Sequence, residues 1–386
     1  METSGPLRPA VVLSLLLAPL FLVAVNAGSA ESPRPNTVVA TVQTGTLPSG
    51  VALDTLNGEV YVTNVGSDTV FAISERNFSV VANISVGWEP VSIAFDPDNG
   101  RLYVANMGAG TLSVINGSEN RVVATVKVGS SAGPVVYDHE NGDIYVANTF
   151  SSGPSSAVSV VSTETDKVIA NVTAGGSPDG VAYDSRNGDI YVTHGAWEGS
   201  PHNVTVISGT TNSVTALIQV GGEGVAFDPD NGNVYVADPG QDLVWVISSS
   251  TNKILTEVLD TNRPEALAFD SANGDMYIAD WGGTVTAVSG SNESEVAVIE
   301  AGINPTNERA PLGIVADPTA GLVFVVSPYS NSMAILYVPL PSATQQWAIL
   351  LVPVMVVVTV ATGVLLSRRL AKNRGNQPVP GHDAAA

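Results

Sequence analysis

The chain has 386 residues, a formal net charge of −21 and no cysteine. The lack of cysteine excludes disulfides, thiolate catalysis, cysteine-ligated zinc, iron–sulfur clusters and covalently attached haem. Between residues 31 and 345 the imbalance is sharper, with 34 acidic and 10 basic residues. Such a surface repels nucleic acid and anionic lipid headgroups, and we interpret the charge as solvation in a salty or acidic medium, in preference to an acidic binding patch.

The first thirty residues predict a signal peptide. Arg8 gives a positively charged n-region, residues 10–25 form an apolar run, and small residues follow. We expect cleavage after Ala27 or Ala30. The alternative is an uncleaved membrane anchor.

Residues 31–340 contain a pattern that recurs seven times. An aspartate precedes an Asn-Gly-type turn and then a strand such as NGEVYVTN (57–64) or NGRLYVAN (99–106). Successive aspartates are 42, 42, 46, 44, 42 and 47 residues apart, at Asp54, Asp96, Asp138, Asp184, Asp228, Asp270 and Asp317. A period of about 40–45 residues with several short strands predicts an all-β fold, a seven-bladed β-propeller.

The second repeat shows the predicted blade. Residues 91–96 form an apolar strand, and the Asn-Gly turn that follows supplies positive φ while Asp96 caps its free N–H groups. Residues 101–106 and 111–116 give the second and third strands, and 121–128 alternates as a half-exposed fourth strand.

The two ends of the repeat array predict how the ring closes. The last repeat supplies only three strands, at 313–317, 322–327 and 332–338. Its missing fourth strand lies at the start, where TVVATVQTG (37–45) matches RVVATVKVG (121–129) closely. We therefore expect the N-terminal strand to complete blade 7 and leave no open edge.

The C-terminal region predicts a membrane anchor. After a linker at 341–346, residues 347–366 are twenty residues without a charge, enough to span a hydrocarbon core of about 30 Å. Arg368, Arg369, Lys372 and Arg374 follow at once, so residues 367–386 should stay in the cytoplasm. The propeller would then lie outside a cell membrane that the chain crosses once.

The repeat resembles a known family. Its Y-V-[TA]-N core, with P-x-G-V-A-x-D before it and T-V-x-V-I after it, resembles the YVTN-type (YncE-like) β-propeller repeat across residues 37–338. The resemblance implies an exported or cell-surface protein, often of a surface layer. Relatives of similar architecture include lactonases and quinoprotein dehydrogenase subunits, but a fold does not confer their chemistry.

A polar ring is expected on the face where the second strands end. These positions could bind an ion or a small polar ligand at the channel mouth, or could instead cap the neighbouring loops. They are Asn64, Asn106, Asn148, His194, Asp238, Asp280 and Ser327. His194 with Asp238 or Asp280 is the one acid–base grouping we find, and we assign no catalytic residue and no metal ligands.

Departures from the repeat point to the same face. Longer connections occur at 149–157, 195–202 and 301–312, and Trp88, Trp197 and Trp281 lie on loops there. Tryptophan on such loops predicts recognition of a sugar ring or a partner protein. The alternative is that each indole fills a gap between blades.

Asn-x-Ser/Thr sequons offer glycosylation positions. They occur at Asn77, Asn83, Asn116, Asn171, Asn203 and Asn292. Asn83 and Asn171 share one phase of the outer strand, at the rim of the propeller. The number of sequons is close to that expected by chance.

These features favour a membrane-anchored, outward-facing propeller that acts as a recognition or scaffold module at the cell surface, with a protein or glycan partner and no cofactor. One alternative is an exported, lactonase-like hydrolase with His194, Asp238 and Asp280 at the channel mouth. Another is a structural surface-layer subunit.

Overall fold

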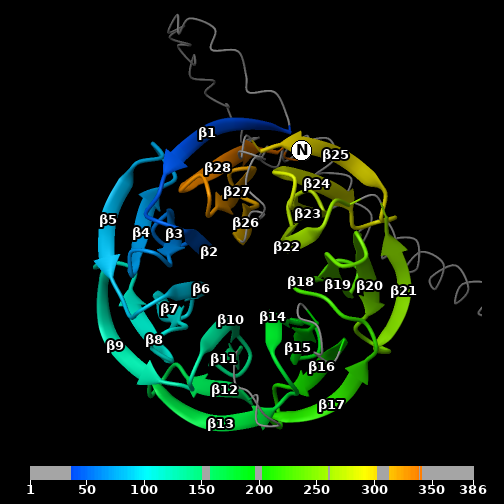
Figure 1. Cartoon of the computed structure of the whole chain (residues 1–386), viewed down its shortest axis with the longest axis horizontal. Helices are drawn as coiled ribbons and strands as arrows, with labels where there is room; N and C mark the ends of the chain where they lie inside the picture. The colour runs from blue at the N-terminus through cyan, green and yellow to red at the C-terminus, as the bar shows by residue number, and fades with distance from the viewer. Residues whose placement is uncertain are drawn as a thin grey trace, which may run out of the picture. The chain divides into compact units, whose positions relative to one another are not determined.

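The computed structural model describes residues 36–149, 157–195, 202–259, 261–301, 313–338 and residue 340. They form seven antiparallel four-stranded sheets arranged in a ring (Figure 1), which confirms the seven-bladed β-propeller. The predicted signal peptide, linker, membrane helix and tail lie outside the described residues. Within the ranges just given, no helix has the length and hydropathy needed to cross a bilayer.

Each blade runs from the channel outward through four strands. The first four blades are β2 (Pro48–Asp54), β3 (Glu59–Asn64), β4 (Thr69–Ser74), β5 (Val80–Ser85); β6 (Pro90–Asp96), β7 (Arg101–Asn106), β8 (Thr111–Asn116), β9 (Arg121–Lys127); β10 (Ala132–Asp138), β11 (Asp143–Asn148), β12 (Ala157–Ser162), β13 (Lys167–Thr173); and β14 (Pro178–Tyr183), β15 (Asp189–His194), β16 (Asn203–Ser208), β17 (Ser213–Ile218). The last three are β18 (Val225–Asp228), β19 (Asn233–Asp238), β20 (Leu243–Ser248), β21 (Lys253–Val258); β22 (Pro264–Asp270), β23 (Asp275–Asp280), β24 (Thr284–Ser289), β25 (Glu295–Glu300); and β26 (Gly313–Asp317), β27 (Leu322–Ser327), β28 (Ser332–Tyr337), β1 (Thr37–Gln43). In blade 2 the predicted strands agree with these bounds to within one residue.

The ring closes through the N-terminal strand, as predicted. β1 pairs antiparallel with β28, with Val42 opposite Met333 and Thr41 opposite Ala334. Figure 1 shows β1 as the outermost strand of the blade that also holds β26, β27 and β28. Blade 7 is thus built from both ends of the propeller sequence.

The repeated aspartate caps the turn between the first and second strands. In blade 2, Oδ1 of Asp96 accepts hydrogen bonds from the backbone N–H groups of Asp98 at 2.9 Å and Asn99 at 3.3 Å. Gly100 then adopts a φ of 68°, in the left-handed region that glycine tolerates. The capping role expected for Asp96 is therefore present in the structure.

The core lies between blades. A buried aromatic ring from each second strand is fully shielded from solvent: Tyr61, Tyr103, Tyr145, Tyr191, Tyr235, Tyr277 and Phe324. The buried apolar side chains form seven clusters, and each cluster joins two neighbouring blades, including blades 7 and 1. Each blade is therefore stabilised by both of its neighbours.

The tyrosine hydroxyls add a polar link at several junctions. Tyr61 donates to Oδ1 of Asn120 in the next blade at 2.6 Å. Tyr145 makes the same bond to Asn212 at 2.7 Å. Because each hydroxyl is buried, the bond satisfies a group that would otherwise lose its water without replacement.

The junction between blades 7 and 1 differs from the others. Blade 7 has Phe324 in place of tyrosine, and the turn after β4 carries Glu75 where blade 2 has Gly117. Burial raises the pKa of Glu75 to about 8, and its hydrogen bond with the Asp317 carboxyl adds to the rise. Burial acts to raise the pKa of Asp317 as well, but hydrogen bonds from Thr319 and Glu75 outweigh it and lower that pKa. At neutral pH Glu75 is therefore protonated, while Asp317 across the closing seam is ionised.

This pair predicts a pH-dependent stability. The pKa of Glu75 is about 8 in the folded chain against a reference of 4.5, so the native state binds this proton more tightly than the unfolded state. Its contribution to the free energy of unfolding therefore falls as pH rises from about 4.5 to about 8. We expect Glu75→Gln to remove this fall, so that thermal melts of the variant and wild type diverge in favour of the variant at the alkaline end.

The control is Glu119→Gln, because Glu119 is an exposed glutamate on the equivalent turn of blade 2. It should follow the wild-type pH profile. Parallel profiles for Glu75→Gln and wild type would contradict a raised pKa of Glu75 at the seam.

Candidate functional site

The strand register defines two faces of the ring. In blade 1, Pro48 at the start of the innermost strand lies opposite Asn64 at the end of the second. The opposite end of the same strand pair holds Asp54 and Glu59 beside the Asn-Gly turn. We call the face that holds Pro48 and Asn64 the loop face, because the connections between blades also lie there.

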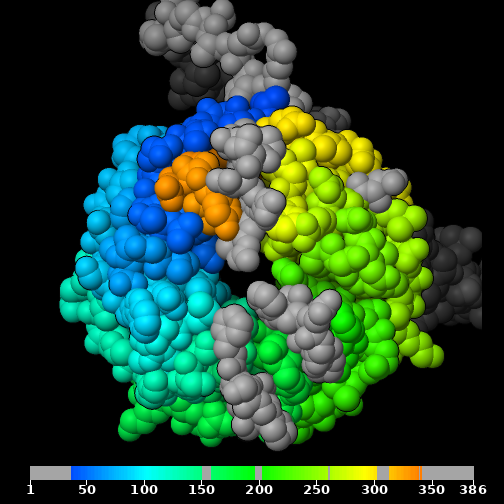
Figure 2. Space-filling model, viewed as in Figure 1, coloured from blue at the N-terminus to red at the C-terminus, as the bar shows by residue number. Residues whose placement is uncertain are grey.

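A cavity of about 350 Å³ occupies the loop-face end of the channel. The space-filling view shows an opening at the centre of the ring (Figure 2). The walls of the cavity come from the first four residues of the innermost strands, among them Ser49, Ser92, Val135, Val181 and Leu267. The volume falls in the range of about 300–1,000 Å³ that small-molecule sites occupy.

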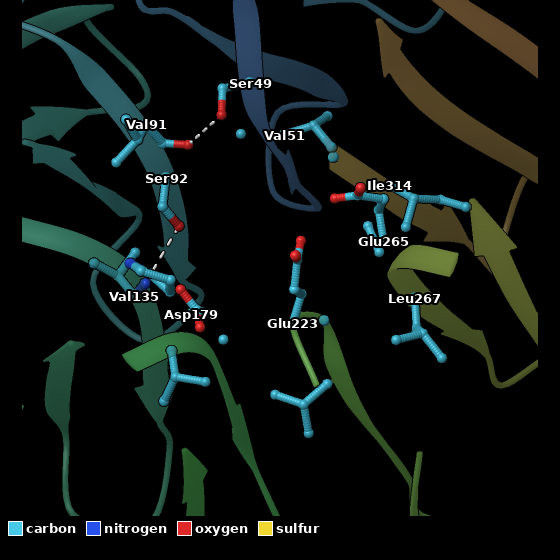
Figure 3. A pocket seen from close by; sticks show the side chains of 18 of the residues that line it. Ser49, Val51, Val91, Ser92, Val135, Asp179, Glu223, Glu265, Leu267 and Ile314 are labelled. Carbon is cyan, nitrogen blue, oxygen red and sulfur yellow. Dashed lines mark hydrogen bonds between the residues drawn. The ribbon is translucent and has the colours of Figure 1, made fainter. Parts of the chain in front are cut away.

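Three carboxylates line this cavity from three consecutive blades. Asp179, Glu223 and Glu265 belong to blades 4, 5 and 6, and Figure 3 shows their side chains directed into the same open space. Asp179 and Glu265 stand at register shifts next to Pro178 and Pro264. A bulge of this kind redirects a side chain out of the regular alternation of the strand.

Sequence reasoning missed these carboxylates, although the repeat contained the signal. The same position holds Ser49 in blade 1, Val91 in blade 2 and Gly133 in blade 3. Acidic residues thus occupy one side of the ring and neutral residues the other. Comparing the repeats at the position five residues before each repeated aspartate would have identified this asymmetry.

Hydrogen bonds at the channel mouth hold the backbone in place near the carboxylates. The backbone N–H of Gly195 donates to Oδ2 of Asp179 at 3.2 Å. The Thr193 hydroxyl donates to the backbone carbonyl of Glu223 at 2.6 Å. In the part of the chain that the structure describes, no three His, Asp or Glu side chains gather as a metal ion would require.

The polar ring predicted from the ends of the second strands is buried. Its members are 0–8 % exposed, and they are Asn64, Asn106, Asn148, His194, Asp238, Asp280 and Ser327. None of them belongs to the lining of the channel cavity. They lie between the strands and the loops that join the blades.

Two blades illustrate how these ring side chains are bonded. Asn64 accepts a hydrogen bond from the backbone N–H of Gly45 at 2.9 Å, which ties blade 1 to the loop arriving from blade 7. Asn148 donates to the Ser159 hydroxyl at 3.0 Å within blade 3. Both bonds hold a loop or a strand end in position.

His194 and the two aspartates considered for acid–base chemistry lie in three different blades. Nδ1 of His194 lies 2.8 Å from the carbonyl of Gly176, and Nε2 lies 3.1 Å from the Thr205 hydroxyl. Burial lowers the pKa of His194, so the ring is neutral at pH 7. Burial raises the pKa of Asp280 to about 6, against a hydrogen bond from Thr286. His194 is thus bonded to its own blade and to the loop that enters it, and Asp280 is bonded within its own blade.

The tryptophans of the loop face have different surroundings. Trp88 is 60 % exposed and lies against Gly108. Trp281 is half-buried, and the Arg263 guanidinium stacks 2.9 Å above its ring. Trp197 lies outside the described residues, as do most of the three long connections. Of the tryptophans predicted for this face and described here, Trp88 therefore presents the most indole surface to solvent.

The sequons divide by exposure. Asn77, Asn83, Asn171 and Asn292 are exposed, whereas Asn116 and Asn203 are half-buried. Asn83 lies on β5 and Asn171 on β13, the outermost strands of blades 1 and 3. The rim position expected for these two side chains is present in the structure.

Comparisons with known proteins identify the fold. No family model and no curated protein matches the chain. A solved structure of hydrazine synthase from Kuenenia stuttgartiensis aligns with a TM-score of 0.67 and 17 % identity over 78 % of this chain and 98 % of that one. At this identity the likeness supports a shared β-propeller architecture and nothing about chemistry.

The ring geometry predicts the outcome of changing His194. Asparagine fills the same position in blades 1 to 3, so His194→Asn should change the free energy of unfolding by less than about 1 kcal/mol. His194→Leu leaves the Gly176 carbonyl without this partner and removes one of the two bonds of the Thr205 hydroxyl, which also bonds to the Ala174 carbonyl, and it should cost about 2 kcal/mol or more. Chemical denaturation of both variants provides the measurement. Equal losses for the two variants would contradict a capping role.

Proposed function

We propose that the protein is a recognition module of the cell surface, and that its partner presents a basic side chain to the channel mouth. The observation that carries this proposal is the arc of Asp179, Glu223 and Glu265 around the cavity. A lysine or arginine of a partner protein supplies the complementary charge, and arginine can engage two carboxylate oxygens at once.

The charge of the whole chain supports the same type of partner. The formal net charge is −21, so the field outside the protein attracts cations and repels anions before any contact forms. A site with three carboxylates at the end of a channel adds a local component to this general attraction. Association should therefore be fast at low ionic strength and slower in salt.

The placement at the cell surface rests on the sequence. The signal-peptide pattern of residues 1–30 and the uncharged stretch at 347–366 support export of the propeller and retention at a membrane. The resemblance to YVTN-type propellers supports the same location. The basic residues after position 366 favour a cytoplasmic tail.

The charge proposal can be tested with a fluorescent tetralysine peptide and the full-length protein in detergent. Glu223→Gln with Glu265→Gln removes two carboxylates from the channel mouth and should weaken binding by about thirtyfold in fluorescence anisotropy, because each close charge pair contributes on the order of 1 kcal/mol. The effect should shrink as the ionic strength rises from about 20 mM toward 150 mM.

A matched control changes the same charge elsewhere. Glu119→Gln with Glu164→Gln alters two exposed glutamates on turns at the opposite face. This control should lower affinity only slightly, through net charge alone. Equal losses of affinity in both double variants would show that the peptide responds to the net charge of the protein, and would reject a binding site at the channel mouth.

The proposed topology predicts which lysines are accessible on intact cells. Lys127, Lys167 and Lys253 belong to the propeller, and Lys372 belongs to the predicted tail. A membrane-impermeant amine reagent should label the first three on intact cells and Lys372 only after lysis, as read by peptide mass spectrometry. Labelling of Lys372 on intact cells together with protection of Lys127 would reverse the orientation.

A further inference from the structure

Blade 5 departs from the way in which other blades hold the end of their second strand. In four blades the third residue of the third strand is a hydroxyl that bonds to the side chain ending the second strand. These pairs are Asn106–Ser113, Asn148–Ser159, His194–Thr205 and Asp280–Thr286. Blade 5 has Trp245 at this position, and its indole Nε1 donates to Oδ2 of Asp238 at 3.1 Å.

Asp238 is fully engaged by its own blade. Its Oδ1 accepts from the backbone N–H groups of Gly240 at 3.1 Å and Gln241 at 3.2 Å. Its Oδ2 accepts from the Gln241 amide at 2.6 Å as well as from Trp245. These bonds fix the indole and the amide on one edge of the blade.

The loop glycine above Asp238 also has a different neighbour. In blades 2 and 3 the side chains of Asn106 and Asn148 lie directly beneath Gly87 and Gly129. In blade 5 His202, from the neighbouring blade, takes this place, because a Cβ added to Gly221 would lie 2.7 Å from its Nδ1. At this junction the loop glycine therefore packs against His202, and not against the side chain that ends the second strand.

A cavity of about 370 Å³ lies at this junction, separate from the channel. Trp245, Val220 and Ile254 form its apolar part, and His202, Gln219 and Gln241 form its polar part. His202, Gln219 and Gln241 are exposed at the surface, while Trp245 is half-buried. The lining therefore combines a fixed aromatic ring with groups that both donate and accept hydrogen bonds.

We propose that this cavity binds one hexose-sized unit of a neutral glycan. A pyranose ring presents a C–H face that packs on an indole, and its hydroxyls need partners able to donate and to accept. The two glutamine amides and the imidazole meet that need. The one carboxylate of the lining, Asp238, has both oxygens engaged by hydrogen bonds from its own blade, so the direct partners of a ligand would be the neutral side chains. This site does not depend on the basic partner proposed for the channel mouth.

The test uses saturation-transfer NMR on the full-length protein in a detergent without sugar headgroups. The probes are the methyl glycosides of glucose, galactose, mannose and N-acetylglucosamine. At least one should receive saturation from the wild-type protein. Trp245→Thr restores the residue found in blades 4 and 6 and should weaken binding on the order of tenfold or more.

Two further variants separate a loss of the binding site from a loss of folding. Gln219→Ala alters an exposed side chain of the cavity and should weaken binding several-fold without affecting the melt, even if Trp245→Thr folds poorly. Trp88→Thr, on the loop above another blade, should bind as the wild type does, and the tetralysine peptide should bind Gln219→Ala normally. Absence of saturation transfer to all four glycosides, or unchanged binding by Gln219→Ala, would overturn the proposal.

Discussion

Every blade of this propeller has two apolar faces, and only its two neighbours can cover them. The second strands show this most clearly, since all residues of β11 and nearly all of β3 and β7 are buried. A row of such sheets would leave its first and last faces in water, so the ring must close for the hydrophobic effect to stabilise any part of it fully. Pairing β1 with β28 meets this requirement.

Close packing between blades also decides where polar groups can act. Polar side chains at the ends of the second strands are enclosed by loops and must be bonded internally, as the partners of Asn64 and His194 show. Polar side chains that face the channel do not need such internal hydrogen bonds, because the channel is open to water. The repeated positions therefore build the ring, and the positions where repeats differ, such as Glu223 and Trp245, provide cavities with distinct chemistry.

Much of the fold could be predicted because its determinants are local and repeated. Asp96 and Gly100 specify a turn, and the match between residues 37–45 and 121–129 identifies a displaced outer strand. The site was harder to predict. Repeat alignment places Asn106 at a strand end, but it does not say that the side chain turns toward Ser113 and the loop above it. The direction of Asp179 depends on a bulge next to Pro178, which is a property of the pairing with β15 and not of either strand alone.

The split last blade also bears on the time course of folding. Val42 and Met333 are partners in the sheet but stand about 290 residues apart in the chain. At synthesis rates of roughly 5–20 residues per second, β1 has no partner for about 15 to 60 seconds after it is made. Contacts of such long range are slow to form, because the entropy of the intervening loop is lost before they stabilise anything. The first strand of the propeller is therefore among the last to be protected, and during that interval its unpaired edge is open to pairing with another molecule.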